Sequence, residues 1–598
     1  MQLKRSVTTR IGVVVVAASA TMAACSGEAK VADPTRVPVS GEALGATVRA
    51  TDAPATTLPP ATTLPPYQRA GWIADENKKP GSDAWRIDIN KVPKNTFIEG
   101  YFNTVSAKIG DTVDLAVSTN APTWTVTGYR MGFYGGTSGR VVFESPPQPG
   151  IQQPAAVVDK NLGLAEARWP SSLKIALTKD FPPGDYLFKL IGSNGAEILV
   201  PLTIRNEDSQ ATVAVINAVT TWQAYNDWGL CSYYKCQPSA GRSRANVVSF
   251  DRPYLFGYNQ GTADFIDHEL ALVSLVEELG LDVDYITDLD IHQKPDSLKK
   301  YKVAVSLGHD EYYSRAMYDS LVNARDAGVN LMFLGANAVY RGIRFEPGFN
   351  GVVDRRMVNY RSTSDPITKT DPQSSTVEWR VSPLNRPENA LIGVMYACAG
   401  VVAPMRITNA SNWVFEGTGA KNGMTLPNVI GNEYDRVYPG SPPTLELLAR
   451  SPLTCRDSSG AADMTYYTAP SGAGVFATGT IRWICSIDAM CTTPDAAKIV
   501  RGVTINVLNA FNAGPAVARY PSKPNLSSAP ATPSGSATSS RPPTTKPPTT
   551  APTTVATTAN RSGATTTSAP TAAPSTTALV TGTTRSAVTT VIAPATTA

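Results

Sequence analysis

Histidine and net charge are both scarce in this sequence, which has three His residues and a formal charge of +4 over 598 residues. The positive excess belongs to the two ends. Residues 1–24 hold three basic side chains and residues 522–598 hold five, and neither segment contains an acid. Subtracting these three and five charges from +4 leaves −4 for residues 25–521. A mildly acidic body offers no basic surface, so nucleic acid is not expected as a partner.

Long apolar runs are also absent, so no segment is expected to span a membrane as a helix. Residues 1–24 begin with Lys4, Arg5 and Arg10 and continue as an apolar run that is too short to cross a bilayer. The run ends in small residues directly before Cys25, a pattern similar to a bacterial lipobox. The segment is predicted to be a lipoprotein signal peptide, with lipid on Cys25 anchoring the protein at the outer face of the cell membrane. Secretion without lipid is the alternative.

Thr, Pro, Ala and Ser dominate residues 25–75 and 517–598. Segments of this composition cannot bury enough apolar surface to become ordered, so we expect an extended linker and a disordered tail. The tail has no Leu-Pro-x-Thr-Gly sorting signal, which leaves covalent attachment to the cell wall unsupported. The chain is too long for one ordinary core, and its 42% hydrophobic content is enough for more than one domain between these segments.

Six Cys residues follow Cys25, and an even number in an exported chain suggests disulfides. The short spacings favour Cys231 with Cys236 and Cys485 with Cys491, and the pair of Cys398 with Cys455 follows by elimination only. Buried free thiols are the alternative. A zinc site is weakly supported, because no Cys-x-x-Cys occurs and no His lies close in sequence to these residues.

Short alternating runs separated by turn residues occupy residues 85–207. Alternation with a period of two, interrupted by Gly, Pro and Asn, is typical of strands and predicts an immunoglobulin-like β-sandwich domain. The runs are 112–118, 125–134, 140–144, 174–178, 185–190 and 196–204.

Residues 208–516 change to a pattern of strands alternating with helices. This alternation requires right-handed crossovers and predicts an α/β domain whose parallel sheet is covered on both faces. A mixed β region follows through Trp483, and residues 494–511 form a closing helix. The predicted strands are 213–216, 282–286, 303–307 and 330–334, and the predicted helices between them are 263–279 and 314–327.

Polar residues cluster where three of these predicted strands end, which is where ligands bind in an open parallel sheet. The clusters are residues 221–228, 308–314 and 335–340, and an acidic segment at 431–436 is expected to fold over them. The candidate residues are His309, Glu311 and Asn337 for catalysis, and Tyr225, Asn226, Asp227 and Trp228 for the pocket.

Each cluster also has a structural interpretation. Glu311 and Ser314 can cap the helix that follows, aromatic residues can cover the rim of a sheet, and His309 can be a hydrogen-bonded structural residue. Carboxylates and phenols on neighbouring loops can instead form an oxygen-rich site for a hard cation, which polarises a carbonyl or activates water. A Ser or Cys nucleophile is unsupported, since no Gly-x-Ser-x-Gly occurs and Asn337 stands at the strand-to-helix turn.

Several motifs, in the expected order, carry a resemblance to a known family. They are Gly308-His309-Asp310-Glu311-Tyr312, residues 279–285, the Gly335-Ala336-Asn337 turn, Gly431-Asn432-Glu433, and residues 129–136 in the sandwich. Together they resemble the C-terminal domain of the N,N-dimethylformamidase large (beta) subunit-like family, and the resemblance covers residues 90–515. It implies a sheet similar to that of class I glutamine amidotransferases, a flavodoxin-like parallel arrangement.

The characterised members of this family hydrolyse a small amide with one iron held by two Tyr and one Glu. The resemblance therefore implies Tyr312 and Glu433 as metal ligands, with iron or zinc as the cofactor. The second Tyr is expected at residues 267–270, where no Tyr stands, so His268 or Glu269 would have to substitute. Gly also replaces the His that the family places two residues before its Glu ligand.

The leading hypothesis is a lipid-anchored envelope protein that hydrolyses a carbon–nitrogen bond, with His309 or Glu311 orienting or deprotonating water. Its partners would be a small amide or cell-wall component and, through the lipid, the membrane. The alternative is a non-catalytic envelope module that binds glycans through Trp222, Tyr225 and Trp228. The missing ligands favour the module, and the polar clusters at three strand ends favour the enzyme.

Overall fold

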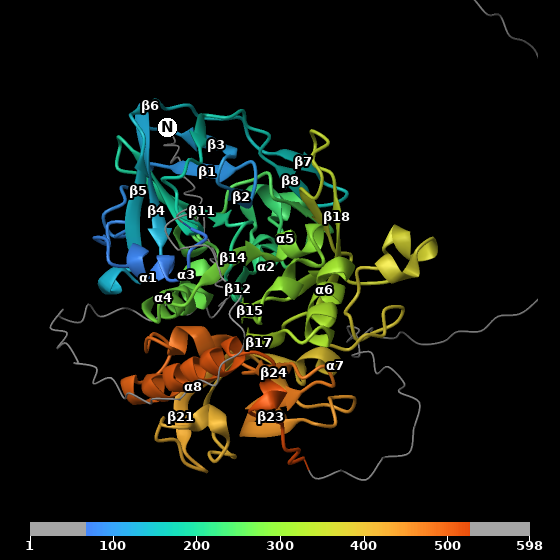
Figure 1. Ribbon diagram of the computed structural model, residues 1–598. Coiled ribbons are helices and arrows are strands. Elements are labelled where there is room, and N and C mark those ends of the chain that lie inside the picture. The colour runs from blue at the N-terminus through green and yellow to red at the C-terminus, as the bar shows by residue number, and fades with distance from the viewer. Residues whose placement is uncertain (1–66, 527–598) are drawn as a thin grey trace, which may run out of the picture. The chain divides into compact units, whose positions relative to one another are not determined.

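The computed structural model describes residues 67–526 (Figure 1). The predicted signal peptide, Cys25, most of the predicted linker and the Thr-rich tail lie outside the described residues, so those predictions stay predictions. Residues 67–526 form 24 strands in six sheets and eight α-helices. No helix in this part of the chain is both long enough and apolar enough to cross a bilayer.

Two sheets from the first part of the chain share one hydrophobic core. One has the strand order β1-β3-β9, and the other has the order β2-β11-β10-β4-β5 with β6 paired to β4. Phe102, Leu115, Val126, Phe188 and Val200 are buried together between them. The strands are β1 (Ile98–Phe102), β2 (Ser106–Lys108), β3 (Thr112–Thr119), β4 (Thr123–Met131), β5 (Gly139–Glu144), β6 (Gln148–Pro149), β9 (Leu173–Ala176), β10 (Gly184–Gly192) and β11 (Glu197–Arg205).

The larger of these sheets is buried on its other face as well. Tyr129, Leu187 and Leu199 belong to a second core that also contains Leu272 and Val276 of α4 (Leu270–Glu278). The near-continuous burial of β10 follows from this position between two cores. The assignment of the sandwich to the immunoglobulin-like type and its boundary at residue 207 remain predictions.

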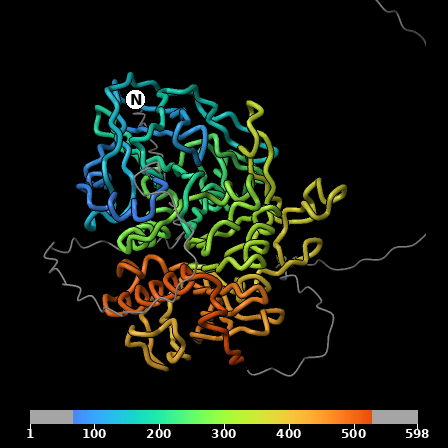
Figure 2. The backbone as a smooth tube through the Cα atoms, in the orientation of Figure 1, coloured from blue at the N-terminus to red at the C-terminus, as the bar shows by residue number. Residues whose placement is uncertain are grey.

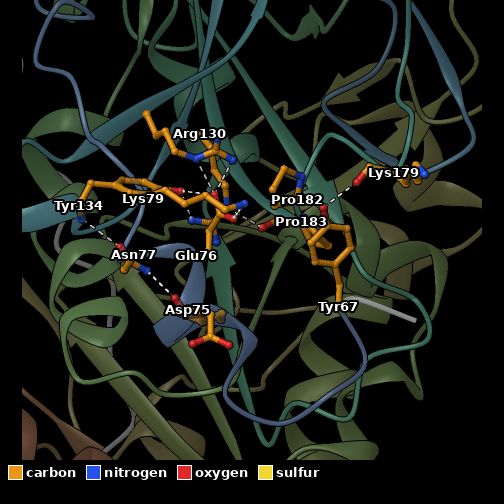
Figure 3. A network of polar contacts seen from close by, with 12 residues as sticks. Tyr67, Asp75, Glu76, Asn77, Lys79, Arg130, Tyr134, Lys179, Pro182 and Pro183 are labelled. Atoms are coloured by element: carbon orange, nitrogen blue, oxygen red, sulfur yellow. Dashed lines mark hydrogen bonds and ion pairs between the residues drawn. The ribbon is translucent and has the colours of Figure 1, made fainter. Parts of the chain in front are cut away.

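A fully buried ion pair joins the sandwich to α4. Arg130 on β4 donates hydrogen bonds of 2.6 and 2.8 Å to the two carboxylate oxygens of Glu277, and neither side chain is exposed. Arg130 also donates to the Tyr134 hydroxyl at 2.8 Å, and Figure 3 shows it in one network with Glu76 and Tyr134. Charges this deep are stable only when each is paired, so the two halves of the contact depend on each other.

The central sheet has seven strands in the order β14-β12-β15-β17-β24-β23-β22. The labels from β14 to β23 follow one another down the view in Figure 1. The first five are parallel, and β23 runs antiparallel to both of its neighbours, so the sheet is mixed. The strands are β12 (Val213–Asn217), β14 (Val283–Thr287), β15 (Val303–Gly308), β17 (Asn330–Gly335), β22 (Glu446–Cys455), β23 (Ser458–Thr468) and β24 (Gly474–Ala477).

Alternating residues of each central strand face two different cores. Val213 and Val215 join the core that contains α4 and α8, whereas Ala214 and Ile216 join the core that contains α6. Apolar residues on both faces explain why these strands read as continuous hydrophobic runs. The helices are α1 (Trp72–Glu76), α2 (Val219–Tyr225), α3 (Phe265–His268), α4, α5 (Asp288–Gln293), α6 (Arg315–Asp326), α7 (Asn389–Ile392) and α8 (Pro494–Asn512).

The prediction of an α/β class with a class I glutamine amidotransferase-like, flavodoxin-like parallel sheet is wrong for this chain. Strands predominate, they are divided among six sheets, and the central sheet is mixed. The error has a physical origin: local hydrophobic periodicity locates a strand but carries no information about its partner or direction. The region expected only as mixed β supplies β22 and β23 to the central sheet.

Three smaller sheets complete the described part of the chain. One has the order β13-β19-β18-β16, another pairs β20 with β21, and the third pairs β7 with β8 (backbone path in Figure 2). Their strands are β7 (Val157–Asp159), β8 (Leu164–Glu166), β13 (Val247–Ser249), β16 (Tyr312–Ser314), β18 (Arg341–Glu346), β19 (Arg356–Val358), β20 (Met395–Arg406) and β21 (Thr425–Arg436).

All three disulfides predicted from the Cys spacing are confirmed. Cys231 bonds to Cys236 and Cys485 to Cys491, each closing a short loop. The third pair, Cys398 with Cys455, links β20 to β22. Disulfides that join segments distant in sequence restrict the unfolded chain most, so this third bond contributes most to holding the β20–β21 hairpin on the central sheet.

Candidate functional site

Polar side chains meet beyond the carboxyl ends of β12 and β15, which pair in parallel. β15 ends at Gly308 and is followed by His309 and Glu311, while α2, directly after β12, ends at Tyr225. The Tyr225 hydroxyl donates a hydrogen bond of 2.9 Å to Glu311 Oε2. Since Glu311 is 1% exposed, its charge acts where electrostatic interactions are strong.

His309 lies between two carboxylates. Its Nδ1 atom is 3.4 Å from Asp264 Oδ2, and its Nε2 atom is 3.6 Å from Glu311 Oε2. Although burial opposes the charged form, Asp264 and Glu311 raise the pKa of His309 well above its ordinary 6.5. The pKa of Glu311 is correspondingly lowered by His309, against the effect of burial. A protonated imidazole cannot accept a proton, so His309 is suited to supplying positive charge rather than to acting as a base.

Tyr234 enters this cluster from the disulfide loop of residues 231–236, which the sequence analysis used only for its Cys pair. Its ring stacks on that of Tyr225, with the centroids 4.1 Å apart. Its hydroxyl donates to Glu311 Oε2 at 2.7 Å and accepts from the Tyr312 hydroxyl at 2.7 Å. The short spacing of Cys231 and Cys236 was the sequence feature that could have drawn attention to Tyr234, because a tight disulfide loop restricts the direction of the side chains within it.

Tyr312 and two arginines form the next layer of the cluster. Arg361 Nη2 donates to the Tyr312 hydroxyl at 2.7 Å, and Arg341, which is opposite Tyr312 in the β16–β18 register, places Nε 3.6 Å from Glu311 Oε1. Burial, reinforced by the nearby Glu311 charge, raises the pKa of Tyr312, so its hydroxyl stays protonated. Neither arginine lies in a motif, and no feature of the sequence identified them.

Glu433 reaches the same cluster from β21. Its Oε2 atom is buried and has no hydrogen-bond partner. Burial, with a contribution from the Glu311 charge, raises the pKa of Glu433 to about 7, while His309, the Asn337 side chain and Arg341 act in the opposite direction. Glu433 is therefore a carboxyl group whose pKa lies near neutrality and whose Oε2 atom accepts no hydrogen bond.

A family model described as N,N-dimethylformamidase beta subunit-like, C-terminal, matches residues 125–495. The chain belongs to this family. The match covers more than half of the sequence, extends from β4 to the start of α8, and includes every residue of the cluster described above. The resemblance inferred from the motifs is confirmed. A search of curated proteins found no match.

Three of the predicted pocket residues have structural contacts instead. The Asn226 amide donates to Gln223 and to the Pro253 carbonyl, each at 2.9 Å, and Asp227 forms a 2.7 Å ion pair with Lys235. Trp228 is 6% exposed. Among the four predicted pocket residues, the described contacts bring Tyr225 alone to Glu311.

Asn337 supports the site through its backbone. Its backbone N–H donates to Asp435 Oδ1 at 2.8 Å, and its backbone is left-handed with φ of 59°. Asp435 lies two residues beyond Glu433 on β21, so the contact ties the end of β17 to the strand that carries Glu433. Ser314 has the structural role considered for it, because its hydroxyl accepts the Met317 amide as the cap of α6.

Two cavities in the described residues lie away from this cluster. A cavity of about 410 Å³ lies beside α6 and β18 and is lined by His292, Ser314, Arg344 and Trp379 among others. A second, of about 30 Å³, lies between the sandwich and α2. We place the candidate site at the Glu311 cluster nevertheless, because there a protonated imidazole, an ionised carboxylate and a carboxyl oxygen without a hydrogen-bond partner occur together.

The residues do not fit the iron centre that the N,N-dimethylformamidase resemblance implies. The Tyr312 hydroxyl is already bonded to a guanidinium and to Tyr234, and a cation as close as Arg361 opposes a second cation on the same oxygen. At the position expected for the second Tyr, His268 faces Asp264, while Glu269 accepts the Trp222 indole N–H at 2.9 Å.

The charge of Glu311 has partners within the protein itself. Asp264 and Glu311 flank the protonated His309, and the Arg341 guanidinium lies 3.6 Å from Glu311. Residues 67–526 contain no group of three or more His, Cys, Asp or Glu side chains arranged to hold a metal.

We expect the purified full-length protein to contain iron and zinc at levels far below one ion per chain, because Arg361 occupies the Tyr312 oxygen. Elemental analysis after growth in iron-supplemented medium measures this directly. Stoichiometric iron that is lost in Tyr312→Phe, with Tyr318→Phe as the matched control, would contradict the expectation.

Proposed function

We propose that this member of the N,N-dimethylformamidase beta subunit-like family hydrolyses the carbon–nitrogen bond of a small amide. The observation that carries the proposal is the state of Glu433. Its buried Oε2 atom lacks a hydrogen-bond partner, and its pKa is about 7 under the influence of the protonated His309 and other neighbouring charges. A general base works best when its pKa is near the working pH, since it is then ionised and still basic. Family membership supports the same reaction class.

In the proposed reaction, Glu433 Oε2 accepts a proton from water while the water oxygen bonds to the amide carbonyl carbon. The carbonyl electron pair moves to oxygen and forms a tetrahedral oxyanion. The oxyanion then collapses, the carbon–nitrogen bond breaks, and Glu433 returns the proton to the leaving nitrogen. The carbon is released as a carboxylic acid and the nitrogen as an amine, so the step consumes only water.

The surrounding groups stabilise the charge that forms on the carbonyl oxygen. The Arg341 guanidinium and the protonated His309 supply positive charge, and both are held in place by Glu311. The hydroxyls of Tyr225 and Tyr234 donate to that same carboxylate and orient it. Preorganised donors and charges in a buried site are usually the largest contribution to catalysis of acyl transfer.

The test is an amine-release assay on N,N-dimethylformamide, N-acetylglycinamide and N-acetylglycine across pH 5–9. Because Glu433 must be ionised to accept a proton, we expect kcat/KM to be low in acid, to rise through about pH 7, and to level off above it. No hydrolysis of any of the three compounds, or a rate that is flat across this range, would refute the proposal.

The glycan-binding alternative finds no support in its two Trp residues. Trp222 and Trp228 are 2% and 6% exposed, so neither ring face is available to stack on a sugar. Both are used in packing: Trp222 contacts Phe265 edge-on, and Trp228 contacts Trp169. Export remains part of the proposal, and the three disulfides support it because such bonds persist in oxidising compartments.

A further inference from the structure

Arg361 carries a charge that no carboxylate in the described part of the chain neutralises through an ion pair. Its Nη2 atom donates to the Tyr312 hydroxyl, its guanidinium lies 4.2 Å from the centroid of the Tyr234 ring, and its buried Nε atom has no hydrogen-bond partner. An unpartnered donor away from water is costly, so such a group in a functional cluster points to an absent acceptor.

The backbone at Arg361 is itself unusual. Its φ is 56°, in the left-handed region that residues with a Cβ seldom adopt. A backbone of this kind persists only where the surroundings hold it, and it is enriched at binding sites. Stacking on Tyr234, which is held by the disulfide loop 231–236, keeps the planar guanidinium in one orientation. The side chain is therefore presented ready for a ligand, with little conformational freedom left to lose.

Arg244 adds a second positive charge beside Arg361. Its Nη2 atom makes one long contact of 3.5 Å with the Tyr360 carbonyl, and residues 67–526 provide it with no ion pair. Arg341, the third guanidinium of the group, differs because it lies 3.6 Å from Glu311 and 3.3 Å from Glu378. The edge of the site thus carries two arginines whose charge is not matched.

We propose that Arg361, assisted by Arg244, binds the carboxylate of an anionic amide, so that the substrates are N-acyl amino acids or similar carboxylate-bearing amides. This inference rests on the proposed hydrolysis and names its substrate class. A guanidinium matches a carboxylate through paired N–H donors, and Arg361 retains the free Nε that such pairing requires. Arg361 reaches Glu311 through only Tyr312 and Tyr234, so a compact substrate can span from the arginine to the reacting carbonyl.

A pair of nearly isosteric probes tests the charge separately from catalysis. Binding of N-acetylglycine and of its neutral amide, N-acetylglycinamide, to the full-length protein is measured by calorimetry. We expect N-acetylglycine to bind at least about tenfold more tightly than N-acetylglycinamide. Hydrogen bonds between charged groups contribute enough free energy to account for a ratio of this size. Arg361→Gln, which keeps a donor for Tyr312 but removes the charge, should abolish the preference, and Arg244→Gln should reduce it.

Arg315→Gln is the matched control, because Arg315 is 59% exposed at its side chain and lines the separate cavity beside α6. We expect its preference for the acid to equal that of the wild type. Arg361→Lys should retain part of the preference, since it keeps the charge without the planar fork. Equal binding of the two probes by the wild type, an unchanged preference in Arg361→Gln, or tighter binding of inorganic phosphate than of N-acetylglycine would overturn the inference.

The two proposals fail in different ways. If the wild type binds N-acetylglycine preferentially but releases no amine from any amide, the proposed hydrolysis is refuted. The assignment of Arg361 as a carboxylate-binding residue is then retained. If the protein hydrolyses N-acetylglycinamide and N-acetylglycine with equal kcat/KM and Arg361→Gln changes neither value, hydrolysis stands and the assignment of the substrate class is wrong.

Discussion

Replacing Glu433 by Gln is expected to lower kcat for amide hydrolysis by about 10²- to 10⁴-fold, the usual contribution of a positioned general base. The amide keeps the size and the hydrogen-bonding capacity of the side chain but cannot take a proton from water. The rise of kcat/KM through about pH 7 should disappear with it, because that rise reports the ionisation of Glu433.

A stability measurement separates this catalytic role from a structural one. The pKa of Glu433 is raised from 4.5 to about 7 in the folded protein, so the folded state holds a proton that the unfolded state has released between these values. The carboxyl group therefore makes the free energy of unfolding fall as pH rises through this window and leaves it lower above pH 7. Glu433→Gln should lack that loss and should be at least as stable as the wild type at pH 8.

Glu446→Gln is the control for this substitution. Glu446 is 4% exposed on β22 and, unlike Glu433, has hydrogen-bond partners in Lys523 and Asn412. We expect kcat and its pH dependence to be unchanged in this variant. A Glu433→Gln protein that is folded and as active as the wild type would eliminate Glu433 as the base.

The second large effect is expected at the contact between the sandwich and α4. Arg130→Met should lower the free energy of unfolding by about 3–5 kcal/mol, because it leaves the fully buried Glu277 carboxylate without its charge partner. Urea denaturation followed by circular dichroism measures the loss. The double variant Arg130→Met, Glu277→Leu should be considerably less destabilised than the sum of the two single variants, because it removes both charges.

An exposed ion pair in the same sandwich provides the comparison. Lys174 and Asp114 are 2.7 Å apart with side chains 69% and 29% exposed, so Lys174→Met should cost less than about 1 kcal/mol. If Arg130→Met lowers the free energy of unfolding no more than Lys174→Met does, the buried ion pair does not stabilise the contact between the sandwich and α4.

Several strands and helices of the second half were predictable from the sequence to within a residue or two, although the helix predicted at 263–279 is divided into α3 and α4. The runs at 213–216, 303–307 and 330–334 correspond to β12, β15 and β17, and residues 494–511 correspond to α8. Their boundaries follow from hydrophobic periodicity and from local signals such as Pro494 in the first turn of α8, capped by Thr493. The class of the sheet did not follow, since strand direction depends on partners far away in the chain.

Part of the candidate site was predictable because its residues lie in recognisable motifs. His309, Glu311 and Tyr312 belong to a motif that follows β15, and Glu433 belongs to a motif within β21. The structure connects them through hydrogen bonds or through the effects of their charges. Tyr234 and Arg361 were missed, because they come from a disulfide loop and from a segment after β19. Trp228 was predicted to line the pocket but is buried in packing, because an aromatic residue near the end of a strand can cover the core as well as a ligand site.

The sequence by itself determined the family, the two local disulfide pairs and the segments that supply the chemistry, because each of these depends on local spacing and residue type. The pair of Cys398 with Cys455, 57 residues apart, followed by elimination only, and the structure confirms it. Only the tertiary structure decided which groups carry charge and which is free to accept a proton. A pKa is set by burial and by neighbouring charges. Here those neighbours come from the segment after β15, from β18 and from β21, and His309 and Glu433 are 124 residues apart in the sequence.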